Sequence, residues 1–168
     1  MSSLPTVAEH LSQEAKTRHA DEADAFGRTA FNRYYYAAFL STRELLTKLD
    51  RSWSGESHAN IPGLLEGGLL KRLRTTLKPL QSKGIVSQSR AMSLLSQAGA
   101  AAGDIAAILR IAYKVRVAAD YEPEEKVTFE PTTFRLATHT EAEAKQWLIR
   151  IDRSKGVILN VAKEVGLV

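Results

Sequence analysis

Apolar residues recur at helical spacing in three long stretches of this chain, and that pattern limits what the chain can fold into. Long helices with one apolar face are expected over residues 28–49, 104–120 and 141–165. Shorter helices are expected over residues 6–20, 64–66 and 69–77 and around Met92. Three long amphipathic helices plus short helices predict an all-α bundle, and 168 residues suit one domain, residues 1–168.

Polar residues at the expected helix starts support this assignment. Thr6 with Glu9, and Thr140 with Glu143, have the spacing of a capping box, in which each residue binds the backbone of the other. Asp104 is a good N-cap residue because its carboxylate can accept from the free N–H groups of the first turn. The helices that follow these residues should therefore begin there.

The segments between the long helices are less regular. Ser87 or Ser89 could cap the short helix that follows them, and Pro123 should stop the helix over 104–120. Residues 126–136 alternate weakly and carry β-branched side chains. They predict either a small hairpin that turns at residues 130–131 or only an extended crossing.

Composition narrows the class of protein. The chain has no cysteine, which excludes disulfides and thiolate metal sites and favours a reducing compartment. We find neither a signal peptide nor an apolar run near the ~20 residues of a membrane span, so a soluble, cytoplasmic protein without membrane contact is expected. The four histidines are scattered, and neither a phosphate-binding glycine loop nor a metal-ligand spacing occurs. No cofactor or metal is expected.

Basic residues are unevenly placed along the chain. The net charge is only +4, but no acidic residue lies between Glu66 and Asp104. A local basic surface attracts phosphates even when the net charge is small. A solvated helix face is the alternative explanation. The basic residues of this segment are Lys71, Arg72, Arg74, Lys78, Lys83 and Arg90.

Three segments resemble motifs of the HEPN superfamily. The segment "FNRYYYAAFLSTRELL", residues 31–46, is similar to its first core helix, which often carries an Arg followed by paired aromatics and small residues. The segment "RVAADYEP", residues 116–123, resembles the end of a later core helix in the branch with an Arg-x-x-Ala-Asp-Tyr motif. Between them, "ESHANIPGLL", residues 56–65, is similar to a Ser-His segment of that branch. The three occur in the family's order and organise residues from about 26 to 147.

This resemblance implies a HEPN-like helical bundle with an RNA-directed role. Many HEPN proteins are metal-independent ribonucleases, and others are inactive bundles that bind RNA or a ligand. They recur in toxin–antitoxin modules, often beside a minimal nucleotidyltransferase, and in antiviral defence systems. They commonly act as homodimers, so RNA, a second copy of the chain and a nucleotidyltransferase or other defence-system protein are the implied partners.

The resemblance also implies a site around Arg116. Arg116 would bind a phosphate, because guanidinium is permanently charged and pairs with two phosphate oxygens. Nuclease members carry a His after four to six intervening residues, whereas Tyr121, separated from Arg116 by four residues, stands at the nearest such position here. Imidazole suits proton transfer near neutral pH, and Tyr does not. Asp120 as base, Tyr121 as hydrogen-bond donor and His58 entering from another segment are the conceivable substitutes.

RNA-binding residues are implied in two further segments. Asn32 and Arg33 would lie near the Arg116 site, and the basic segment would guide the strand. The residues implied in that guiding role are Lys71, Arg72, Arg74 and Lys78.

Each candidate also has a purely structural explanation. Arg116 and Asp120 are spaced i, i+4, which suits an ion pair within one helix. Tyr121 could close the edge of the core with its hydroxyl in water. Asn32 and Arg33 could snorkel, with the polar end of the side chain in water, or bond a loop carbonyl. His58 could cap the short helix after it. 

Three classes of function follow from these alternatives. The first is an RNA-directed protein that is a metal-independent ribonuclease. The second is a non-catalytic bundle that binds RNA or a nucleotide, or is the partner subunit of a nucleotidyltransferase. The third is an interaction module that binds no nucleic acid.

Overall fold

The computed structural model describes residues 3–168, and these residues form a predominantly helical fold. The predicted all-α class with three long helices is confirmed. The long helices are α2 (Ala20–Leu49), α5 (Gln88–Tyr121) and α6 (Glu141–Glu164). The shorter helical elements are α1 (Leu4–Thr17), η1 (Arg51–Trp53), α3 (Ile61–Gly63), η2 (Leu64–Gly68) and α4 (Leu69–Ser82). The strands are β1 (Thr128–Phe129), β2 (Phe134–Leu136) and β3 (His139–Thr140).

The chain divides into two compact units. Unit 1 contains the residues up to Leu40 together with Leu109–Ile149, and unit 2 contains Ser41–Ile108 and Arg150–Val168. The long helices α2, α5 and α6 each contribute residues to both units. A single domain over residues 1–168 stays a prediction.

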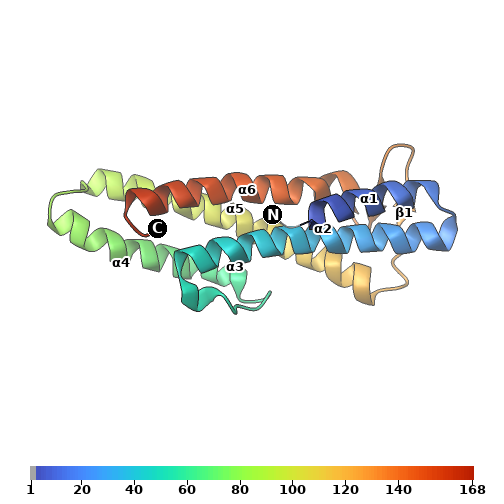
Figure 1. Cartoon of the computed structure of the whole chain (residues 1–168), viewed down its shortest axis with the longest axis horizontal. Coiled ribbons are helices and arrows are strands. Elements are labelled where there is room, and N and C mark those ends of the chain that lie inside the picture. Colours follow the sequence, from blue (N-terminus) through green and yellow to red (C-terminus); the bar gives the residue numbers. More distant parts are fainter. Residues whose placement is uncertain (1–2) are drawn as a thin grey trace. The chain divides into compact units, whose positions relative to one another are not determined.

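In unit 1, α1 and α2 begin earlier than the sequence pattern predicted. Figure 1 shows α1 alongside the first half of α2. Ser3 is the N-cap of α1, and a proline lies in its first turn. The predicted capping box of Thr6 and Glu9 is therefore wrong, and Glu9 instead accepts a hydrogen bond of 3.1 Å from the Tyr34 hydroxyl in α2.

The three strands form one small antiparallel sheet in unit 1, in the order β1-β2-β3. The hairpin predicted near residues 126–136 is present, with Thr128 opposite Arg135 and a turn in which the Glu130 N–H donates to the Thr133 carbonyl at 2.8 Å. Phe134 of β2 is fully buried and meets the Phe31 ring of α2 edge-on at 5.6 Å. The sheet therefore covers the start of α2.

In unit 2, α5 begins at Gln88 and runs without a break through the region where the sequence pattern predicted two separate helices. The Arg90 N–H donates to the Ser87 Oγ at 3.2 Å, so the predicted Ser87 cap is present. The predicted Asp104 cap is wrong because α5 continues through this residue. Asp104 accepts hydrogen bonds from Arg150 and from Ser154 of α6, the latter at 3.0 Å. The Asp104 carboxylate therefore binds side chains of α6 instead of capping the start of a helix.

The helix α4 also runs further than predicted. It continues through Pro79 to Ser82, and Gly84, two residues later, is in the left-handed region at φ 71°. The Ile85 N–H donates to the Leu80 carbonyl at 2.9 Å, which closes a Schellman-type end. Before α4, the π-helical turn η2 takes the place of the helical piece expected over residues 64–66.

Among residues 3–168, α5 is long and apolar enough to cross a membrane by length and composition alone. The sequence pattern predicted no such segment, because it indicated two separate helices in this region. Buried core helices have the same character. Ala102, Ile105 and Ala112 of α5 are fully buried, so we interpret α5 as a core helix.

Candidate functional site

The last two turns of α5 place an arginine beside an aspartate. The Nε of Arg116 lies 2.9 Å from the Oδ2 of Asp120, and their side chains are 17% and 27% exposed. The predicted i, i+4 ion pair is therefore present. The Nε–H of Arg116 is buried and finds no well-aligned hydrogen-bond acceptor among residues 3–168. The Asp120 oxygen is close to this Nε–H but is not aligned to accept a hydrogen bond from it.

A residue of α2 completes this pair. The Nδ2 of Asn32 donates a hydrogen bond of 2.7 Å to the Oδ1 of Asp120, so each carboxylate oxygen of Asp120 faces a donor from a different helix. Asn32 and Asp120 are 88 residues apart in the chain. The fold thus brings together Asn32, Arg116 and Asp120, as the resemblance implied.

Tyr121 forms the outer side of the same cluster. Its ring centroid lies 5.1 Å from the Arg116 Cζ, and the residue is 66% exposed. Tyr121 therefore does not close the core, and its ring is available to solvent beside a cation. Burial of the guanidinium lowers the pKa of Arg116, but Tyr121, Asp120 and Tyr36 outweigh this effect and raise it above its ordinary value. Arg116 is a permanent cation. We call Asn32, Arg116, Asp120 and Tyr121 the Arg116 cluster.

Arg28 of α2 holds the end of α5 in place. It donates from Nε to the Ala119 carbonyl at 3.0 Å and from Nη2 to the carbonyls of Ala118 and Glu122 at 2.8 and 2.9 Å. A further hydrogen bond reaches the Glu125 carbonyl. These carbonyls belong to the last turn of α5 and the loop after it, where the carbonyls of Ala118 and Glu122 also accept from the backbone N–H groups of Glu122 and Glu125. The sequence pattern does not indicate this role of Arg28, because its acceptors are backbone atoms about ninety residues away, which carry no residue-type signal.

Arg33 and His58 are the other residues that the resemblance implied near this site. Arg33 is partly exposed and makes no ion pair with any residue of the described range 3–168. His58 lies in the turn before α3, in unit 2, and Asn60 rather than His58 is the N-cap of α3. The cap predicted for His58 is therefore wrong.

The basic segment of unit 2 presents a row of cations along α4. Lys71, Arg74 and Lys78 are exposed, follow each other at spacings of three and four residues, and so share one helix face. None of them makes an ion pair within residues 3–168. Arg72, by contrast, lies 3.6 Å from an oxygen of Asp50. We call Lys71, Arg74 and Lys78 the α4 basic stripe.

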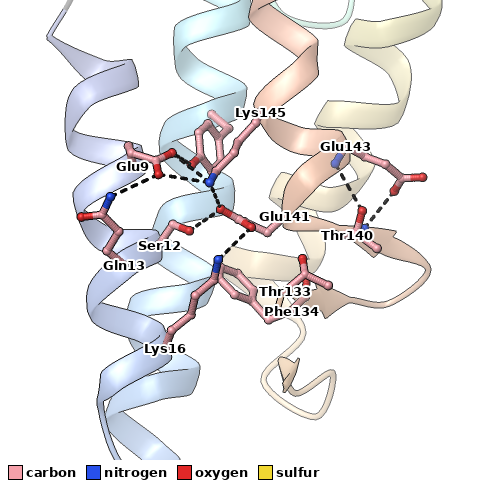
Figure 2. A network of polar contacts seen from close by, with 11 residues as sticks. Glu9, Ser12, Gln13, Lys16, Thr133, Phe134, Thr140, Glu141, Glu143 and Lys145 are labelled. Carbon is pink, nitrogen blue, oxygen red and sulfur yellow. Dashed lines mark hydrogen bonds and ion pairs between the residues drawn. The ribbon is translucent and has the colours of Figure 1, made fainter. Parts of the chain in front are cut away.

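A second polar cluster in unit 1 joins α1, α2 and α6 (Figure 2). The Glu141 carboxylate is 3% exposed and lies 2.5 Å from the Lys145 Nζ and 3.3 Å from the Lys16 Nζ. It also accepts a hydrogen bond from Ser12. Burial raises the pKa of Glu141, but the hydrogen bonds from Lys145 and Ser12 outweigh it, so the net pKa is below its ordinary value. All of these charges are paired, which suits a structural role.

The capping box predicted for α6 begins beside this network. Figure 2 shows Thr140 and Glu143 facing each other. The Thr140 N–H donates to the Glu143 Oε2 at 2.8 Å, and the Glu143 N–H donates to the Thr140 Oγ1 at 3.2 Å. This prediction is confirmed.

Two hollows in unit 1 lie outside the Arg116 cluster. The larger, of about 570 Å³, is lined by Lys16, Arg18 and Lys126, each of which is paired with an acid. The other, of about 480 Å³, lies between Tyr113 of α5 and His139. In the part of the chain that the structure describes, no group of three or more His, Asp or Glu residues could hold a metal ion.

Comparison with known proteins gives no relative. No family model, no curated protein and no solved structure matches this chain.

Proposed function

We propose that this chain is a HEPN-type RNA-directed protein whose Arg116 cluster binds an RNA phosphate. The observation that carries the proposal is the convergence of Asn32 and Arg116 on one point at the end of α5. A guanidinium and a side-chain amide from two helices are donors that suit phosphate oxygens. The exposed ring of Tyr121 adds a surface on which a base can stack.

The α4 basic stripe supports binding to a nucleic-acid backbone. Its three cations lack acidic partners within residues 3–168, and they lie in a segment without acidic residues from 67 to 103. Unpaired cations on one helix face attract phosphates without reading sequence. This stripe would add affinity, and the Arg116 cluster would add a defined contact.

The geometry favours binding over cleavage. Cleavage without a metal needs a group that takes the 2′-OH proton and one that protonates the leaving oxygen. Asp120 is engaged by both Asn32 and Arg116, and Tyr121 stands where nuclease members of the family carry His. We therefore propose the non-catalytic RNA-binding form, within the toxin or defence setting and the homodimeric assembly that the resemblance implies.

The test is incubation of the purified protein with a labelled single-stranded RNA in EDTA, with binding and cleavage measured together. We expect salt-sensitive binding without cleavage, and weaker binding by Arg116→Ala. The matched control is Arg18→Ala, which removes the same charge from unit 1 at an exposed pair with Glu14. EDTA-resistant cleavage that Arg116→Ala abolishes would show a ribonuclease instead. Equal binding by wild type and Arg116→Ala would exclude the assigned site.

A further inference from the structure

Asp120 occupies the position that a phosphate would take in the proposed site. Its Oδ1 accepts from Asn32 and its Oδ2 lies beside Arg116, so both donors already face an internal anion. A carboxylate and a phosphate present their oxygens to a guanidinium in the same way. The site is therefore filled by the chain itself.

Helix stability does not explain this aspartate. Asp120 lies in the last turn of α5, where the partial negative charge of the helix end disfavours an acid. The order of the pair, with the basic residue four positions before the acidic one, is also the less favourable orientation within a helix. Two local effects thus make an aspartate at position 120 unfavourable for the stability of α5.

The contact between Asp120 and Arg116 is also incomplete. The Arg116 Nε–H is buried without a well-aligned acceptor in residues 3–168, although the Asp120 oxygen is only 2.9 Å away. The Asp120 side chain is partly exposed, at 27%, whereas Arg116 lies deeper, at 17%. The carboxylate can move into solvent and leave the guanidinium to a better-placed oxygen.

We propose that Asp120 is a built-in competitor that keeps the Arg116 site closed to phosphate until RNA displaces it. This inference rests on the proposed function and concerns the regulation of the same site. Asp120 lowers RNA affinity by occupying the donors and by repelling the incoming charge. RNA then binds only where further contacts compensate for the displacement of Asp120.

The test compares the affinity of a labelled single-stranded RNA for wild type and Asp120→Asn, a change that keeps the shape and removes the charge. We expect Asp120→Asn to bind about tenfold more tightly. Glu124→Gln is the matched control, because it removes one exposed acid near the same helix end that makes no ion pair within residues 3–168. We expect it to change affinity much less. Asp120→Ala should reproduce the gain, and circular dichroism checks that each variant is folded.

The double variant Arg116→Ala/Asp120→Asn separates the two proposals. The gain from Asp120→Asn should disappear in it, since the donor that Asp120 blocks is then missing. If Arg116→Ala weakens binding but Asp120→Asn binds no tighter than Glu124→Gln, the competitor role is wrong and the proposed function stands. Unchanged affinity with loss of EDTA-resistant cleavage would make Asp120 a catalytic base and would also overturn the inference. If Arg116→Ala binds like wild type, the proposed function itself fails.

Discussion

The Nε of Arg28 in α2 donates a hydrogen bond of 3.0 Å to the backbone carbonyl of Ala119 at the end of α5. This contact and its three companions fix the turn that carries Asp120 and Tyr121. We expect Arg28→Ala to lower the free energy of unfolding by about 2–3 kcal/mol, because several carbonyls lose a charged donor. Urea unfolding followed by circular dichroism measures this change.

The control for Arg28 lies on the same helix. Arg33→Ala removes an identical side chain that makes no ion pair within residues 3–168, and it should change stability by under about 0.5 kcal/mol. Arg28→Lys should recover only part of the loss, since one ammonium cannot reproduce the forked guanidinium. Equal stabilities of Arg28→Ala and Arg33→Ala would show that the cap is unimportant.

The buried Glu141 should make stability depend on pH. Its pKa in the folded protein is below the ordinary value, so its contribution is complete above the unfolded pKa of about 4.3 and is lost as pH falls through the folded value. We expect Glu141→Gln to cost about 3 kcal/mol at neutral pH and progressively less in acid. Unfolding curves at several pH values test this, with Glu124→Gln as the exposed control. A constant difference between wild type and Glu141→Gln across this range would contradict it.

The close approach of the β-hairpin to α2 can be tested at Gly27. A Cβ added there would lie 3.1 and 3.2 Å from the two methyl carbons of Val127, whereas one added at Gly103 or Gly156 meets nothing within 4 Å. Gly103→Ala and Gly156→Ala should each stabilise the protein by about 0.8 kcal/mol, as expected for alanine in a helix. The free energy of unfolding of Gly27→Ala should be lower than that of these two variants by roughly 1–2 kcal/mol, because the added methyl group crowds Val127. Thermal unfolding of the three variants decides this, and an equal gain at all three would refute the close packing.

The α4 basic stripe can be tested by its salt dependence. Replacing Lys71, Arg74 and Lys78 together with alanine should weaken RNA binding at low salt and reduce the slope of log affinity against log salt by about 2. The matched control is a triple alanine variant of three cations that are each ion-paired, Arg18, Arg90 and Lys155. Equal losses in both triple variants would show that only net charge matters.

Local signals predicted much of the fold. The capping box at Thr140, the hairpin turn and the end of α2 at Leu49 each depend on residues close in sequence, and the structure confirms them. The predicted break at Asp104 was wrong because its partner Arg150 comes from another helix. A strong capping residue is not a helix start when tertiary contacts satisfy its side chain.

Only part of the candidate site could be predicted from the sequence. The spacing of Arg116 and Asp120 predicts their ion pair directly. The resemblance implied only that Asn32 lies near this site, and no local rule predicts its hydrogen bond with Asp120, which is 88 residues away. No pattern in the sequence indicated that Arg28 binds the backbone at the end of α5. The RNA-directed role of the Arg116 cluster stays a prediction.

A salt titration of RNA binding by wild type and Arg116→Ala tests this role most directly. Affinity for a short single-stranded RNA is measured by fluorescence anisotropy at increasing salt, with Arg18→Ala as the control. We predict that Arg116→Ala binds about tenfold more weakly at low salt and has a slope smaller by about one, because one phosphate contact is lost. Superimposable titrations for wild type and Arg116→Ala would contradict the central claim.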